Sequence, residues 1–265
     1  MKFVIDSLER VRDRRPLVHN ITNFVVMNTT ANALLALGAS PVMAHAEEEL
    51  EEMIRIADAV VINIGTLDSS WKKSMIKAAK IAKELDKPVV LDPVGAGATK
   101  FRTEVSRKIL DIGVAILKGN FGEISALLGE HGKTRGVDSA SYDERMAKEI
   151  SFAASKEFNT VVAVTGKVDY VSDGNKIFAV YNGHEMLGRV TGTGCIVSAI
   201  TGAFVAVTDP LKAAVSALTV FGIAAEKAYE EAKYPGSFHV KLYDWLYRIN
   251  GEVIMEYAKV REVGP

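Results

Sequence analysis

The sequence has little cysteine, almost no net charge and no long apolar run, and the first two shortages already exclude some classes of protein. Cys195 is the only cysteine in 265 residues, so no disulfide can form within the chain, as is typical of a reducing compartment. The 32 basic and 33 acidic side chains leave a formal net charge of −1, which gives no field to attract phosphate backbones. We therefore expect no nucleic-acid partner.

The apolar segments are too short to cross a membrane or to form the core of a signal peptide. The two most apolar runs, 195–208 and 213–225, contain serine and threonine and fall short of the roughly 20 residues that a spanning helix needs. Residues 1–15 mix acidic and basic side chains with few apolar ones. We expect a cytoplasmic protein with no membrane partner. The five histidines lack metal-ligand spacing, so structural zinc is not expected either.

Between residues 17 and 165 the sequence alternates short β-branched runs with amphipathic segments. Strands are predicted at 17–21, 41–43, 59–63, 88–92, 115–117 and 160–164. Helices are predicted at 23–37, 47–57, 70–85, 103–111, 122–128 and 142–157. This order is typical of βαβ units, and the strands are apolar without alternation, as expected when helices cover both faces. The pattern predicts an α/β fold with a mostly parallel sheet.

Beyond residue 165 the pattern changes to one hairpin followed by helices. Segments 169–172 and 176–181 flank Asp173-Gly174, a dipeptide favoured in tight hairpin turns, so one antiparallel element should follow the parallel strands. Segments 193–207, 211–233 and 242–261 are predicted to be helical. No repeat, low-complexity tract or linker interrupts the chain, so we expect a single domain over residues 1–265.

Ligands of open parallel sheets bind beyond the carboxyl ends of the strands, so the residues that follow each predicted strand are candidates for a site. Many of them are Gly, Asn, Asp or Glu. They lie at 20–23, 43–45, 65–66, 92–97, 118–123 and 165–166. These segments should converge on one edge of the sheet.

The segment Thr191-Gly192-Thr193-Gly194-Cys195 precedes a long apolar helical run. Glycines before a helix let a ligand approach the backbone, and the free amide groups with the helix dipole bind anions such as phosphate. The same residues would also suit a tight turn into a core helix. The dipole would lower the pKa of the Cys195 thiol, which could act as a nucleophile, a general base or a small buried filler.

Two carboxylates follow predicted strands and could hold a cation. Asp92 precedes a glycine-containing loop, where it could hold Mg²⁺ through water or form a turn before proline. Glu123 follows Asn120 at capping-box spacing, and the spacing alone favours a helix cap. The functional alternative places Glu123 at the same cation as Asp92, with Lys118 beside phosphate groups.

Taken together, these motifs resemble the hydroxyethylthiazole kinase family of the ribokinase-like superfamily. The matching stretches occur in the family's order from about residue 16 to residue 247, and such linked motifs are far more specific than any one of them. They are 18–23 (VHNITN), 31–43 (ANALLALGASPVM), 63–67 (NIGTL), 91–97 (LDPVGAG), Gly119-Asn120 with Glu123, 191–195 (TGTGC) and 235–238 (PGSF). The resemblance implies a ribokinase-like fold without a separate lid domain.

The resemblance also implies a reaction and residues for it. The reaction is transfer of the γ-phosphoryl group of ATP to the primary hydroxyl of 5-(2-hydroxyethyl)-4-methylthiazole, in thiazole salvage for thiamine biosynthesis. The implied residues are Thr193, Gly194 and Cys195 as the catalytic anion hole, Asn23, Met43, Gly65 and Gly192 in the thiazole pocket, Lys118 and Thr165 at ATP, and Asp92 and Glu123 at Mg²⁺. Asn23 could also cap the helix predicted at 23–37.

Two of these positions are unusual. The wider superfamily has a catalytic Asp, acting as base, where this chain, like the family it resembles, has a cysteine, Cys195. Positioning and electrostatics would then supply most of the rate. We hypothesise that Cys195→Asp retains or raises turnover and that Cys195→Ala lowers it modestly. Lys118 stands where the family has Arg, which keeps the charge but loses the bidentate fork.

The resemblance further implies a homotrimer with active sites between neighbouring subunits. Two other functions stay compatible with the sequence. One is a related kinase that acts on pyridoxal or hydroxymethylpyrimidine. The other is a nucleotide-responsive binding protein without catalysis, against which the presence of Asp92, Glu123 and the intact Gly-Thr-Gly-Cys argues.

Overall fold

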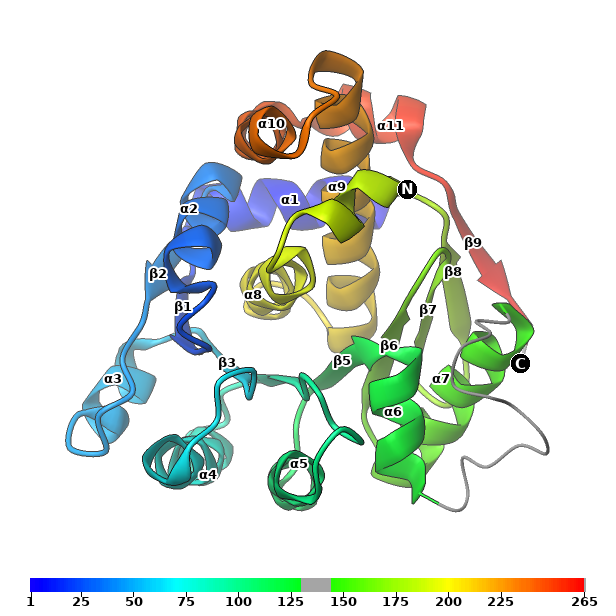
Figure 1. The fold of residues 1–265 in the computed structure, drawn as a ribbon. Coiled ribbons are helices and arrows are strands. Elements are labelled where there is room, and N and C mark those ends of the chain that lie inside the picture. The colour runs from blue at the N-terminus through cyan, green and yellow to red at the C-terminus, as the bar shows by residue number, and fades with distance from the viewer. Residues whose placement is uncertain (130–143, 265) are drawn as a thin grey trace.

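A nine-stranded sheet lies at the centre of the computed structural model, which describes residues 1–129 and 144–264 (Figure 1). The strands are β1 Leu17–Ile21, β2 Ser40–Val42, β3 Ala59–Asn63, β4 Val89–Asp92, β5 Ile116–Asn120, β6 Val161–Thr165, β7 Asp169–Ser172, β8 Ile177–Val180 and β9 Val260–Val263. Their order is β2-β1-β3-β4-β5-β6-β7-β8-β9. The strands from β2 to β6 pair in parallel, and β7, β8 and β9 each pair antiparallel with the strand before them.

Helices cover both faces of the sheet (Figure 1). One layer contains α1 Lys2–Arg14, α2 Met27–Leu37, α8 Thr193–Val205, α9 Pro210–Glu231, α10 Pro235–Arg248 and α11 Gly251–Tyr257, with the short 3-10 helix η2 Glu185–Arg189. The other contains α3 Leu50–Ile56, α4 Ser69–Glu84, α5 Lys100–Ile112, α6 Phe121–Leu128 and α7 Glu144–Phe158. Each layer buries its own apolar cluster against the sheet, which confirms the predicted α/β class with helices on both faces.

The position of α8 matters most for function, because its first residues carry the glycine motif. Every residue of α8 from Ile196 to Val205 is buried, as expected for a helix that is apolar all round. Its close approach to the sheet depends on Gly202, since a Cβ there would lie 2.5 Å from Val61 and 2.8 Å from Val18. The amino end of α8 is thereby held at the carboxyl ends of the parallel strands.

The structure differs from the prediction mainly at the two ends of the described chain. Helix α1 was not predicted, and α2 begins at Met27 instead of residue 23. The predicted helix 242–261 is wrong at its end, where β9 pairs with β8, because this long-range pairing overrides a local pattern that reads as helical. The predicted start of α7 at Tyr142 lies outside the described residues. Among the residues described, no helix is long and apolar enough to cross a membrane.

Candidate active site

The first turn of α8 offers unpaired backbone amide groups. Gly192 precedes the helix with φ 84°, a left-handed conformation that favours glycine, and a Cβ there would lie 2.5 Å from Val26. No side chain caps this helix, and the first backbone bond runs from Ile196 N to Gly192 O at 2.9 Å. The amides of Thr193, Gly194 and Cys195 therefore have no intrahelical acceptor and can bind an anion.

Asp92, at the end of β4, is the centre of a buried polar network. Its Oδ2 accepts hydrogen bonds from Asn63 Nδ2 at 2.8 Å and from Ser198 Oγ at 2.6 Å. The ammonium of Lys118 lies 3.6 Å from the same oxygen and donates to the carbonyl of Gly194 at 2.9 Å. No described residue donates a hydrogen bond to Oδ1. The network joins β3, β4, β5 and α8 and leaves one carboxylate oxygen open to a further ligand.

Lys118 of β5 places a buried cation beside the first turn of α8. Burial by itself would lower the pKa of its ammonium, but the negative groups around it, Asp92 first among them, more than offset this and raise the pKa. Lys118 therefore stays protonated at neutral pH. Its charge lies beside the α8 amides, so both contribute positive potential to the same place.

Glu123 fills the structural role that its spacing indicates and also lies at the candidate site. It forms a capping box with Asn120, and its Oε1 accepts the Gly95 amide of the loop after Asp92 at 2.9 Å. Burial and the negative charge of Asp92 raise the pKa of Glu123, so the two carboxylates repel each other. A cation between them would relieve this repulsion.

A divalent cation would need ligands from its substrate as well as from the protein. Among the described residues, no group of three or more His, Cys, Asp or Glu side chains could hold a metal ion. Asp92 and Glu123 nevertheless supply the hard oxygen donors that Mg²⁺ prefers, and Mg²⁺ usually completes its shell with water and substrate phosphates. The two carboxylates fit that kind of site.

Cys195 is half-buried beside two asparagines. Asn23 Nδ2 lies 3.5 Å from its Sγ and donates to Asn63 Oδ1 at 2.8 Å. The expected lowering of the thiol pKa is wrong, because burial and the nearby charge of Asp92 raise it more than Lys118 and the hydrogen bonds with Asn63 and Asn23 lower it. Cys195 is therefore a neutral thiol at neutral pH.

The residues predicted for the thiazole pocket lie along the same edge of the sheet. Asn23 does not cap a helix, because α2 begins after Val26 and the Asn23 side chain instead accepts the Val25 amide at 3.1 Å. Asn23 covers Gly65, where a Cβ would lie 2.7 Å from its Nδ2. Met43 is half-buried just after the edge strand β2.

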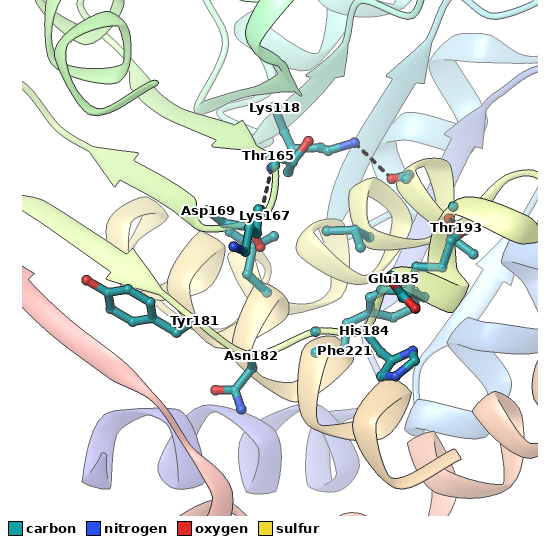
Figure 2. A pocket seen from close by; sticks show the side chains of 18 residues that line it. Lys118, Thr165, Lys167, Asp169, Tyr181, Asn182, His184, Glu185, Thr193 and Phe221 are labelled. Atoms are coloured by element: carbon teal, nitrogen blue, oxygen red, sulfur yellow. Dashed lines mark hydrogen bonds between the residues drawn. The ribbon is translucent and has the colours of Figure 1, made fainter. Parts of the chain in front are cut away.

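A cavity of about 650 Å³ opens beside Lys118 and the first turn of α8, within the range of roughly 300–1,000 Å³ typical of small-molecule sites (Figure 2). Its lining does not include Asn23, Met43 or Gly65 of the predicted thiazole pocket. Lys118, Thr165, Thr193 and Gly194 are among its lining residues, and the Lys118 ammonium reaches toward α8. Apolar side chains from η2, α8 and α9 also line it, namely Leu187, Val197, Leu218 and Phe221. The cavity thus combines a positive charge with an apolar lining.

Asp169 is a cavity residue that the sequence analysis missed. Its carboxylate accepts the Gly166 amide at 2.9 Å and lies on the cavity wall near Lys118 (Figure 2). Burial raises the pKa of Asp169 to about 7, although the Gly166 amide and the Lys118 charge act to lower it. The folded protein therefore favours the neutral form of this carboxyl group.

We expect Asp169→Asn to stabilise the protein above pH 7. Because the folded state holds the Asp169 proton more tightly than the unfolded state, the stability that this group contributes is present at low pH and lost as pH rises through about 7. Asparagine still accepts the Gly166 amide and carries no charge, so Tm at pH 8 should rise by roughly 2–4 °C. Calorimetric melting from pH 5 to pH 9 measures this. The control is Asp173→Asn in the β7–β8 turn, and an equal rise there would contradict the explanation.

Several contacts of the site had no signal in the sequence. Ser198 lies one turn after Cys195 and could be linked to Asp92 only once α8 is placed against β4. Asn63 ends an apolar strand, which marks it as a candidate, but its hydrogen bonds to Asn23 and Asp92 join it to elements far away in the sequence. The cavity wall formed by residues 181–188 contains little regular structure and so has no periodic pattern.

Comparisons with known proteins agree with the resemblance. A family model described as the hydroxyethylthiazole kinase family matches residues 8–252. Hydroxyethylthiazole kinases of Pyrococcus abyssi and Pyrococcus horikoshii are 79% and 80% identical, covering 100% and 99% of both chains. The structure of the P. horikoshii protein superposes with a TM-score of 0.94 at 77% identity over 99% of this chain and all of that one.

More distant solved structures share the fold alone. Pyridoxal kinase from Staphylococcus aureus, in complex with AMP-PCP and pyridoxal, has a TM-score of 0.67 at 18% identity. The superposed region covers 94% of this chain and 99% of the pyridoxal kinase chain. The central sheet and its helices therefore share the fold of this pyridoxal kinase and of a ribokinase-like superfamily protein from Enterococcus faecalis, in agreement with the fold that the motifs implied.

Proposed function

This chain belongs to the hydroxyethylthiazole kinase family, and from that membership we propose that it transfers the γ-phosphoryl group of ATP to the primary hydroxyl of hydroxyethylthiazole, for thiamine biosynthesis. The observation that carries the site assignment is the free first turn of α8, which faces the 650 Å³ cavity beside the buried Lys118 ammonium. Free amides beside a positive charge suit the polyphosphate of a nucleotide, and the apolar side chains of the cavity suit its base.

The transferred group belongs at the amides of Thr193, Gly194 and Cys195. Charge develops on its oxygens in the transition state, and amides that are already oriented stabilise it without reorganisation. Lys118, held by Asp92 and the Gly194 carbonyl, adds a fixed positive charge at the same place. Thr165 lies across the cavity from α8 and would contact the nucleotide.

The carboxylates of Asp92 and Glu123 are the residues that would hold Mg²⁺. When bound, this ion neutralises negative charge on the β- and γ-phosphates. Asn63 and Ser198 bind one oxygen of Asp92 and so orient the other. The chain's own contribution is thus a carboxylate fixed by hydrogen bonds.

The acceptor alcohol belongs beside Cys195 and Asn23, with Gly65, Gly192 and Met43 in its pocket. The neutral thiol is a weak base, so the pocket would act mainly by holding the hydroxyl in line with the γ-phosphate.

The proposal also includes a cytoplasmic homotrimer in which neighbouring subunits complete the pockets. The subunit contact is supported by Phe24 and Val25, which directly follow Asn23 and are each 60% exposed. A neighbouring subunit would cover these apolar side chains.

The test is ADP release coupled to three alcohols offered in turn: hydroxyethylthiazole, pyridoxal and hydroxymethylpyrimidine. We expect kcat/KM to be highest for the thiazole and ADP release without an alcohol to be negligible. A preference for the pyridine or pyrimidine alcohol would overturn the substrate assignment. ATP binding without transfer to any of the three would instead identify a binding protein.

We expect Cys195→Asp to retain or exceed the turnover of the parent protein and Cys195→Ala to lower it modestly. Aspartate supplies a stronger base at the acceptor hydroxyl, whereas alanine removes only a neutral thiol that accepts from Asn23. Steady-state kcat with saturating thiazole and ATP measures the effect. Complete loss of turnover in a folded Cys195→Asp protein would argue against a base at this position.

A further inference from the structure

One wall of the nucleotide cavity is formed by the segment that leaves β8. Seven cavity residues come from positions 181–188, and only the short η2 gives this segment regular structure. Figure 2 shows Tyr181, Asn182 and His184 following one another along this wall. Since helix or sheet bonds do not fix the segment between β8 and η2, other contacts must hold it.

The buried side chain of Asn182 ties this wall to the C-terminal part of the chain. Its Nδ2 donates to the Tyr257 carbonyl at 2.9 Å and to Glu226 Oε1 at 3.2 Å. Its Oδ1 accepts the Lys259 amide at 2.7 Å. The bond from Tyr181 N to Lys259 O, at 2.9 Å, adds a direct backbone link. Both ends of the amide group are occupied within the protein.

Glu226 of α9 binds both this wall and the segment that precedes β9. Its Oε1 also accepts the amide of Gly183 at 2.9 Å, and its Oε2 pairs with Lys259 Nζ at 3.0 Å. One turn earlier, a Cβ on Gly222 would lie 2.6 Å from Asn182, so the wall rests directly on the helix backbone. A single carboxylate therefore joins the wall, α9 and the segment entering β9.

We propose that Asn182, Glu226 and Lys259 form a positioning unit for the nucleotide, an inference that rests on the proposed function of this cavity. Their polar groups bind one another and the backbone instead of facing a ligand, so none of them is a catalytic residue. They hold the wall that packs against the nucleotide. The segment before β9 thereby takes part in ATP binding although it lies outside the cavity lining.

The test compares Glu226→Ala with Glu226→Gln. Alanine removes the acceptor shared by Asn182 and Gly183, so Kd and KM for ATP should rise about 10-fold, while KM for the thiazole alcohol and kcat stay within about 3-fold. Glutamine keeps an acceptor oxygen, so Kd for ATP should stay within about 3-fold of the parent value. The control is Lys176→Ala, which removes an exposed ion pair with Glu262 at the far end of β9 and should not change ATP binding.

A second variant keeps the test decisive if Glu226→Ala does not fold. Asn182→Asp replaces the donor to Glu226 Oε1 and to the Tyr257 carbonyl with a carboxylate oxygen, so Kd for ATP should again rise about 10-fold. Calorimetric Kd values test the unit even if the thiazole is not the substrate. Unchanged Kd for ATP in folded Glu226→Ala and Asn182→Asp proteins, with stability alone reduced, would overturn the proposal.

Discussion

Replacing Asp92 with asparagine is expected to lower kcat by about 10²–10³-fold, the effect of losing one preoriented electrostatic group at a reacting centre. The amide has nearly the same shape but cannot balance the buried Lys118 ammonium 3.6 Å away. Its neutral oxygen can still accept from Asn63 and Ser198, but these hydrogen bonds lose the strength that the negative charge gives them. Because breaking a buried ion pair leaves an uncompensated charge, unfolding free energy should fall by about 3–5 kcal/mol. Steady-state kinetics and guanidinium unfolding measure the two effects.

Two control variants separate the causes in the Asp92 experiment. Asp58→Asn removes a carboxylate that accepts the Leu17 amide at the amino ends of β1 and β3, far from the candidate site. It should leave kcat unchanged. Lys118→Met combined with Asp92→Asn removes both charges, so the double variant should be more stable than Asp92→Asn alone. A folded Asp92→Asn protein with kcat within about 3-fold of the parent would refute a role for Asp92 at the reacting centre.

Replacing Gly192 with alanine is expected to damage both folding and turnover. The backbone there has φ 84°, which costs an L-residue about 1–2 kcal/mol, and the new Cβ would lie 2.5 Å from Val26. Relieving such overpacking typically costs a further 1–3 kcal/mol or so. A shift of about 1 Å in the α8 amides would then lower kcat about 100-fold. Chemical denaturation and initial rates with saturating ATP check both numbers.

Two further variants distinguish backbone strain from steric crowding at Gly192. Gly194→Ala places a Cβ 3.5 Å from Lys118 Nζ, an ordinary contact, so its stability should change far less. Adding Val26→Ala to Gly192→Ala removes the crowding but not the strained backbone, so it should restore only part of the lost stability. If Gly192→Ala alone matches the parent in stability and turnover, the left-handed turn is not needed to start α8.

The parallel core could be predicted because each strand carries its own signal. Runs such as 59–63 are apolar without alternation, which a strand covered on both faces requires, and the structure confirms β3 at those residues. Position after a strand then marked Asp92, Lys118 and Glu123 as candidate site residues without knowledge of side-chain geometry. Strand β9 escaped prediction because its pairing partner lies some 80 positions earlier in the sequence.

The electrostatics of the site could not be predicted in the same way. Local reasoning assigns Cys195 a lowered pKa from the helix dipole, but burial and the charge of Asp92 act in the opposite direction. Both depend on how α8 lies against β4, which no local pattern contains. The raised pKa of Asp169 likewise follows from its burial beside the cavity, not from its neighbours along the chain.

The buried Lys118–Asp92 pair has a consequence for behaviour in different buffers. Dissolved salt screens exposed charges within about 10 Å at 0.1 M but reaches buried ones far less. Surface pairs such as Arg55–Glu51, whose side chains are both well exposed, should weaken as ionic strength increases. The position of the Lys118 ammonium beside the first turn of α8 should persist at high ionic strength. Concentrated salt would therefore slow the association of an anionic substrate without changing the geometry of the site that binds it.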